Sequence, residues 1–433
     1  MLRCLVVLVC IVSAVAGQSP NAAFVEELVV LNNDGRFSDN IQEDASLDVP
    51  ELVRKYGYPL EEHTVETSDG YILTMHRIPH GREANNDAGQ RPVVFLMHGL
   101  LSSSADFVLM GPGSGLGYIL ADEGYDVWMG NARGNYYSRK HLKLRPDALL
   151  NTDFWNFSWD EIGNIDVAAM IDHALETTGR SRLHYIGFSQ GTTTFFVLAS
   201  LKPEYNDKII SMHALAPVAF MANNRNLLLN ALAPFSRSLS RLANLIGIGE
   251  FMPNRLIYTW AGEAFCKDEA LFQPICSSIL FLIAGWNENQ HNTTMMPVVF
   301  GHTPAGASVR QFAHYGQGIS GNKFRRFDHG MTRNLLTYGR ISAPDYDLKK
   351  ITTPVFLHYS SSDPLAHVND VDKLWSELKN PVGKFRVQEN TFSHLDFIAG
   401  RSPHAEYVTR LNQESAFGPT LSDNLLLDAI LDV

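Results

Sequence analysis

The sequence has little positive charge. Its 433 residues carry 35 Lys and Arg against 46 Asp and Glu, which gives a formal net charge of −11. Surfaces that bind nucleic acid need the opposite balance, and so does strong general attraction to anionic membranes. We therefore expect no nucleic-acid partner.

Long apolar runs and cofactor motifs are also lacking. No stretch after the N-terminus reaches the roughly 20 apolar residues that a membrane-spanning helix needs, so we expect no transmembrane segment. There is no H-E-x-x-H zinc motif and no G-x-x-x-x-G-K-[ST] phosphate-binding loop. We expect neither a metal nor a cofactor. Internal repeats and low-complexity tracts are absent as well.

Residues 1–17 are typical of a secretory signal peptide. Arg3 precedes an apolar run over residues 5–12, and residues 14–16, Ala-Val-Ala, form a small-residue cleavage signature. The alternative is a membrane anchor, but the run is short for one. Residues 18–48 then form an acidic leader with few aromatic residues, which we expect to be disordered or removed, with the ordered chain beginning at Val49.

Cysteine is scarce: four residues, of which Cys4 and Cys10 lie in the signal peptide. In an exported chain, the remaining Cys266 and Cys276 favour one disulfide that closes a short loop, the alternative being two buried thiols. Two N-glycosylation sequons agree with export. Asn292 has polar neighbours and is expected to be accessible, whereas Asn156 lies among aromatic residues, where burial would leave it unmodified.

A candidate nucleophile lies in residues 187–191, Gly-Phe-Ser-Gln-Gly. An apolar stretch precedes this pentapeptide and a helix-forming stretch follows it, which is the context of a nucleophile elbow. The glycines allow a sharp turn, and Ser189 would stand at a helix N-terminus, where negative charge is favoured. The alternative is an ordinary Gly-rich turn between a strand and a helix.

The chain before this turn predicts a sheet buried on both faces. Residues 62–78 predict a hairpin around an Asp-Gly turn, and residues 93–97 are apolar throughout, as in a parallel strand under helices. That strand runs into His98-Gly99-Leu100. A Gly turn upstream of a nucleophile elbow is where an oxyanion-binding loop belongs, and Leu100 would supply its N–H. His98 is expected to fix the turn rather than act as a base.

Two further side chains complete a possible catalytic triad. Asp363 follows a buried strand and His394 follows the next one, so both belong at the carboxyl edge of the sheet, with Ser189. Serine, acid, histidine is the order along the chain in α/β-hydrolases. Other candidates are weaker. Asp370 and Asp372 are expected on the solvated face of a helix, Asp396 is expected to brace the turn, and His367 to start a helix, while His404 lies past the last core strand.

Strand and helix alternation stops in the middle of the chain. From residue 218 to about 350 the sequence shows irregular apolar helices, which predict an inserted helical cap or lid; the alternative is a separate second domain. The expected organisation is an α/β-hydrolase fold with a mostly parallel central sheet. Its core would comprise residues 49–217 and 351–433, interrupted by the cap at 218–350.

Five motif blocks, in the right order, resemble the acid lipases of the gastric and lysosomal type, within the α/β-hydrolase lipases. The resemblance covers about residues 49–410. The first block, residues 56–73, includes Tyr-Gly-Tyr-Pro and Thr-Ser-Asp-Gly-Tyr-Ile-Leu. The other four are Met-His-Gly-Leu-Leu (97–101), Gly-Asn-Ala-Arg-Gly-Asn (130–135), Gly-Phe-Ser-Gln-Gly-Thr (187–192) and His-Leu-Asp-Phe (394–397).

The resemblance implies roles for individual residues. Ser189 would be the nucleophile, Asp363 the acid and His394 the base, with an oxyanion hole formed by the N–H groups of Leu100 and Gln190. Cys266 and Cys276 resemble the disulfide pair of the family. An acidic working pH is suggested by the resemblance alone.

The expected function is hydrolysis of neutral lipid esters, triacylglycerol or cholesteryl ester, at a lipid droplet or emulsion surface. The protein would be secreted, with the lysosome as the alternative compartment, and monomeric. Two other functions stay open. A carboxylesterase for small soluble esters is disfavoured by the large apolar insertion, and a non-catalytic lipid-binding protein is disfavoured by the presence of all three triad residues.

Overall fold

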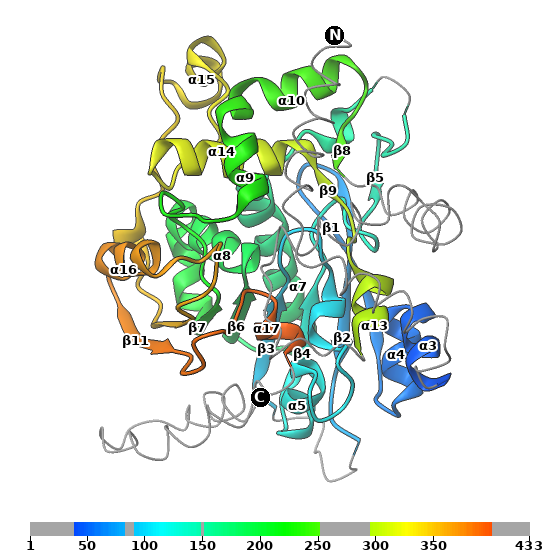
Figure 1. The fold of residues 1–433 in the computed structure, drawn as a ribbon. Helices are drawn as coiled ribbons and strands as arrows, with labels where there is room; N and C mark the ends of the chain where they lie inside the picture. The colour runs from blue at the N-terminus through cyan, green and yellow to red at the C-terminus, as the bar shows by residue number, and fades with distance from the viewer. Residues whose placement is uncertain (1–38, 83–90, 149–150, 252–294, 401–433) are drawn as a thin grey trace, which may run out of the picture.

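The computed structural model describes residues 39–82, 91–148, 151–251 and 295–400. Its centre is a sheet with the strand order β1-β2-β4-β3-β6-β7-β10-β11, with β5 paired to β2 outside this path (Figure 1). The strands are β1 Glu61–Glu66, β2 Tyr71–Ile78, β3 Val93–Met97, β4 Asp126–Gly130, β5 Lys140–His141, β6 Leu183–Phe188, β7 Ile209–Leu215, β10 Val355–Tyr359 and β11 Pro381–Arg386.

The sheet is mostly parallel, as predicted. Strands from β4 to β11 pair in parallel, whereas β1 with β2 and β2 with β4 are antiparallel. β3, β4 and β6 are buried along their whole length, which explains the unbroken apolar sequence of β3 and the mostly apolar sequences of β4 and β6. The α/β-hydrolase fold predicted from these strands is confirmed.

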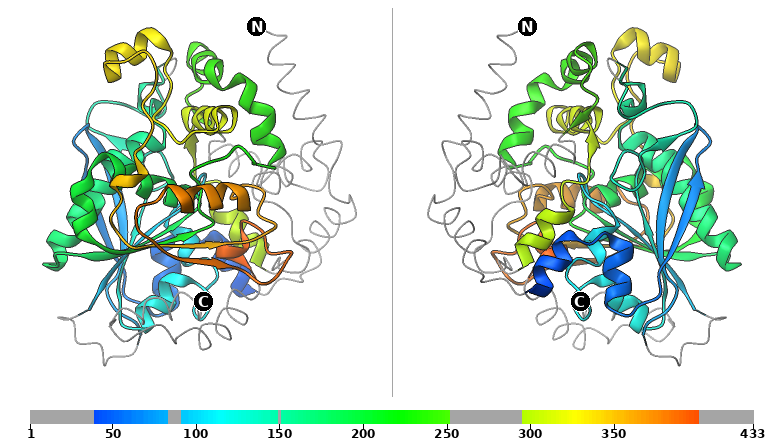
Figure 2. Two further views of the ribbon diagram at one scale, coloured as in Figure 1. Left: turned by 90° about the vertical axis from the view of Figure 1, so that its left-hand side faces the viewer. Right: turned by 90° about the vertical axis from the view of Figure 1, so that its right-hand side faces the viewer.

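Helices cover both faces of the sheet (Figure 2). The helices of this part are α5 Leu116–Asp122, α6 Trp159–Glu161, α7 Ala168–Thr178, α8 Gln190–Leu201, α16 Val368–Glu377 and α17 Asp396–Ala399. Between α6 and α7 the chain forms a π-helical segment, Ile162–Val167, which packs on α8. A Cβ at Gly163 would lie 2.6 Å from the Thr194 carbonyl oxygen, so this close packing requires glycine.

Most helices of the middle of the chain lie at the end of the molecule where β6 enters α8 (Figure 1), whereas residues 296–302 pack against residues 39–46. α14 contacts both α9 and α10. The elements of this part are α9 Leu227–Leu232, α10 Ser236–Leu245, α13 Met296–His302, α14 Val309–Gly321, α15 Met331–Tyr338, and the strands β8 Glu250–Phe251 and β9 Ala307–Ser308. The described part of the predicted cap is therefore mainly helical. None of the described helices is long and apolar enough to span a membrane.

The ordered chain begins earlier than Val49. Helix α3, Asp39–Ser46, precedes α4, Val49–Lys55, and packs against α13 (Figure 1). Asp44 of α3 is buried, with its carboxylate 2.6 Å from Lys55 Nζ and 2.5 Å from Tyr56 Oη. The acidic composition of this segment suggested a loosely ordered leader, but the buried carboxylate of Asp44 forms an ion pair with Lys55 of α4.

Candidate active site

Ser189 lies between β6 and α8 in a backbone conformation that side chains rarely adopt, with φ 51° and ψ −116°. Such conformations cost about 1–3 kcal/mol and persist where neighbours hold them. Here the Ser189 N–H donates to the Leu215 carbonyl over 2.9 Å. A Cβ on Gly191 would lie 2.0 Å from the Met97 carbonyl oxygen. This glycine therefore lets the turn pack directly on the end of β3.

The structure brings together the three residues predicted as a triad. His394 Nε2 lies 2.7 Å from Ser189 Oγ, and His394 Nδ1 lies 2.7 Å from Asp363 Oδ2. All three residues are at least nine-tenths buried. The other carboxylate oxygen of Asp363 accepts the N–H groups of Leu365 and Ala366 at 2.7 and 2.8 Å. These contacts fix the carboxylate, which in turn orients the imidazole toward the serine.

The topology explains this meeting of distant residues. Ser189, Asp363 and His394 follow β6, β10 and β11, whose carboxyl ends share one edge of the sheet. The turn that carries His394 is fixed from both sides. Ser360 Oγ donates to the Phe392 carbonyl over 2.6 Å, and the Ser393 N–H donates to Asp396 over 2.6 Å. Asp396 therefore braces the turn.

The loop after β3 approaches the serine closely. A Cβ on Gly99 would lie 3.1 Å from the Phe188 ring and 3.4 Å from Ser189 Cβ. His98 Nδ1 donates to the Gly99 carbonyl over 2.7 Å, while its Nε2 accepts the Ala132 N–H over 3.1 Å. Burial lowers the pKa of His98 to about 4, so the ring is neutral and holds the turn.

Asp106 supports this loop, and nothing in the sequence pattern marked it. It lies in the 3₁₀ helix Ser104–Phe107, fully enclosed behind the turn, where its carboxylate accepts the Gly99 N–H at 3.2 Å and the Ser102 hydroxyl. Burial raises its pKa to about 6, although these two donors favour the charged form. A carboxyl that changes charge near neutral pH therefore holds the residue preceding Leu100.

A small cavity of about 50 Å³ opens onto Ser189 and His394. Leu100 and Leu365 of the core line it, together with Met221, Leu229 of α9 and Tyr315 of α14. Gln190, the first residue of α8, is tied to α14 by a side-chain hydrogen bond from Gln311 over 3.2 Å. The helical insertion thus gives the serine a mostly apolar roof.

The prediction for Asp370 was wrong. The residue was expected on a solvated helix face, but it is buried and accepts the backbone N–H and the side-chain amide of Asn223 at 2.9 and 2.8 Å. Asp372 is exposed as expected and pairs with Lys384. His367 begins α16 by accepting the Asn369 N–H.

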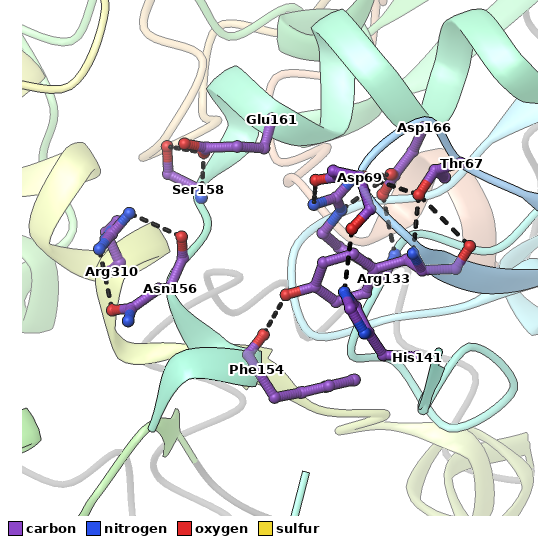
Figure 3. A network of polar contacts seen from close by, with 11 residues as sticks. Thr67, Asp69, Arg133, His141, Phe154, Asn156, Ser158, Glu161, Asp166 and Arg310 are labelled. Carbon is purple, nitrogen blue, oxygen red and sulfur yellow. Dashed lines mark hydrogen bonds and ion pairs between the residues drawn. The ribbon is translucent and has the colours of Figure 1, made fainter. Parts of the chain in front are cut away.

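Of the other predicted modification sites, only one can be located. Cys266, Cys276 and Asn292 lie outside the described residues, as do the signal peptide and His404. Asn156 is half-buried, and its side-chain nitrogen donates to Asp153 over 3.1 Å. Its side-chain oxygen accepts from Arg310 at 2.9 Å (Figure 3) and from Asn244 at 3.1 Å. A glycan on the side-chain nitrogen would compete with its contact to Asp153. The described residues contain no group of three potential metal ligands.

A buried ion network joins the loop after β4 to the rest of the core (Figure 3). Arg133 contacts the carboxylates of Asp166 and Asp69, each at 2.6 Å, and stacks 3.9 Å from the centre of the Tyr71 ring. The Arg133 and Asp166 side chains are almost fully buried, whereas Asp69 is one-third exposed. Burial opposes the charge on Arg133, but the two carboxylates outweigh it and raise its pKa.

Comparisons with known proteins agree with the fold and identify a family. Residues 49–111 match a partial alpha/beta-hydrolase lipase region, and residues 92–400 match the alpha/beta hydrolase fold. The chain is 46% identical to Lipase 3 of Drosophila melanogaster over 82% of its own length and 89% of that protein. It is 39% identical to the gastric triacylglycerol lipase of Bos taurus (84% and 89% covered) and 38% identical to the human lysosomal acid lipase/cholesteryl ester hydrolase (83% and 88% covered).

Proposed function

The chain belongs to the α/β-hydrolase lipases of the gastric and lysosomal acid lipase family, and from this premise we propose that it is a secreted serine lipase that hydrolyses triacylglycerol or cholesteryl ester. The observation that carries the proposal is the buried series Ser189–His394–Asp363, with two contacts of 2.7 Å, beneath a mostly apolar roof. The relatives named gastric triacylglycerol lipase and lysosomal acid lipase/cholesteryl ester hydrolase support the choice of substrate.

In the proposed mechanism, His394 Nε2 takes the proton of Ser189 as the serine oxygen attacks the ester carbonyl carbon. The N–H groups of Leu100 and Gln190 stabilise the oxyanion; Gln190 starts α8, where the first N–H groups have no partner within the helix. His394 then protonates the departing alcohol. A water molecule, deprotonated by the same histidine, releases the fatty acid and restores Ser189. This chemistry needs no cofactor.

The experiment that tests this function compares three substrates on the full chain: emulsified long-chain triacylglycerol, emulsified cholesteryl ester and a short soluble ester. We expect hydrolysis of at least one emulsified substrate, with the Ser189→Ala protein as the blank. Turnover of the soluble ester alone would favour a carboxylesterase. Binding of lipid without turnover of any ester would favour a carrier protein.

Asp106 predicts a pH dependence of the same reaction. Below its pKa of about 6 the group is neutral, and above it a carboxylate lies behind the loop that would receive the oxyanion. Like charges repel across a buried site, so the Asp106→Asn protein should gain relative to the wild type as the pH rises. We expect the ratio of their kcat/KM values on a soluble ester to increase a few-fold, about half to one order of magnitude, between pH 5 and 8.

Asparagine keeps the shape of the side chain and can still accept the Gly99 N–H. The Asp106→Ala protein loses that support, and its activity should be lower at every pH. A ratio of Asp106→Asn to wild type that stays constant across the pH range would contradict the electrostatic effect of Asp106.

A further inference from the structure

Helix α15 leaves its aliphatic residues exposed and buries only a polar one. Asn334 is its one buried residue, whereas Met331, Leu335 and Leu336 are 71%, 53% and 82% exposed. Ile341, just beyond the helix, is 63% exposed. A helix that only covers a core turns these groups the other way, and clustered exposed apolar side chains mark interaction surfaces. We call residues 330–341 the α15 knob.

Hydrogen bonds and an ion pair hold the α15 knob in place where it joins the rest of the protein. An antiparallel backbone bridge between Arg325 and Asp345 joins the chain before the knob to the chain after it, and the two side chains form an ion pair of 2.8 Å. Asn334 accepts the His329 N–H over 2.9 Å, and its side-chain nitrogen donates to Asp328 and to the Ile341 carbonyl at 2.7 and 3.1 Å. The exposed apolar side chains therefore project from a hydrogen-bonded scaffold.

The position of the α15 knob suits a surface that presents substrate. α15 projects from the same end of the molecule as α10 and α14, and α14 contributes Tyr315 to the roof over Ser189 (Figures 1 and 2). The last residue of α10, Leu245, is also apolar and 79% accessible, and Ile248, just after the helix, is 48% accessible. A single flat interface could thus meet both helices near the site.

The charge of the α15 knob selects the partner. Arg333 and Arg340 are exposed, take part in none of the ion pairs found among the described residues, and share residues 330–341 with no Asp or Glu. A second copy would set these arginines against each other across a two-fold axis. Apolar side chains flanked by arginines instead fit a lipid–water interface with anionic groups at head-group level.

We propose that the α15 knob anchors this protein to a lipid surface that carries negative charge, such as neutral lipid coated with released fatty acid. The proposal rests on the proposed function, because hydrolysis of lipid esters supplies both the surface and the carboxylates. The protein as a whole is anionic, with a net charge of −11, but screening limits each charge to about 10 Å. The local arginines therefore govern the contact.

The test is sedimentation of the full chain with phosphatidylcholine vesicles, with and without phosphatidylglycerol. Leu335→Ser/Leu336→Ser should weaken binding to anionic vesicles by about ten-fold or more. Arg333→Gln/Arg340→Gln should abolish the preference for anionic over neutral vesicles. Val382→Ser, which changes an apolar residue on β11 as exposed as Leu335 (53% accessible), should bind as the wild type does.

Activity assays separate the test of the α15 knob from the test of the proposed function. All three variants should hydrolyse a short soluble ester as the wild type does, which shows that they are folded, while Leu335→Ser/Leu336→Ser loses activity on emulsified lipid. Vesicle binding needs no turnover, so it can be scored even if no ester is hydrolysed. Unchanged vesicle binding of Leu335→Ser/Leu336→Ser would overturn the proposal. So would a wild-type dimer that these substitutions convert to monomer, because a second copy would then be the partner.

Discussion

Replacement of Ser189 by alanine should abolish ester hydrolysis, with kcat lower by about 10⁵-fold or more. The hydroxyl is the group that His394 Nε2 contacts at 2.7 Å, and alanine offers nothing to attack the carbonyl carbon. The fold should persist, because the Ser189 N–H still donates to the Leu215 carbonyl and alanine adds no atom. Release of fatty acid or alcohol at saturating substrate measures the effect.

A second serine–histidine pair supplies a matched control. Ser211 Oγ lies 2.8 Å from His184 Nδ1, and both residues are buried, but they lie within β7 and β6 rather than at the sheet edge. Ser211→Ala should leave kcat within about two-fold, since the substitution is far from the reacting ester. A fluorophosphonate should add its mass to wild type and Ser211→Ala but not to Ser189→Ala. Esterase activity retained by Ser189→Ala would refute the proposed nucleophile.

The buried strands and the meeting of Ser189, Asp363 and His394 could be anticipated from the sequence, and for one reason. Each of these features depends on a local pattern: a continuous apolar run makes a buried strand, and a polar residue just after such a run lies at the carboxyl edge. The pentapeptide around Ser189 adds a backbone constraint, because the space beside Gly191 is already filled by the Met97 carbonyl.

Other features depend on partners that are distant in sequence, and no local pattern marks them. Asp370 has the spacing of a solvated helix residue, but Asn223, 147 positions away, covers it. Asp106 follows an unremarkable run of serines, and only the fold turns it behind Gly99. The exposed apolar face of α15 was missed because periodicity identifies an apolar side without indicating that this side faces solvent.

Replacement of Arg133 by methionine should destabilise the protein by about 3–5 kcal/mol. Methionine fills similar space but leaves the fully buried Asp166 carboxylate without its cation, and removes a fixed link to Asp69 on the turn between β1 and β2. The network also carries the loop whose Ala132 N–H holds His98. Urea unfolding should show the loss of free energy, and scanning calorimetry a melting temperature lower by roughly 5 °C.

An exposed arginine gives the reference for this change. Arg54 lies 3.5 Å from Glu62, with both side chains about half exposed, and Arg54→Met should cost no more than about 0.5 kcal/mol, because water and salt screen the pair. Arg133→Lys should fall between the two methionine variants, since an ammonium group keeps the charge but lacks the planar fork that reaches both carboxylates. If Arg133→Met were no less stable than Arg54→Met, the buried network would contribute nothing beyond packing. A stable Arg133→Lys protein with the full wild-type free energy would instead assign the effect to charge alone and not to the geometry of the guanidinium.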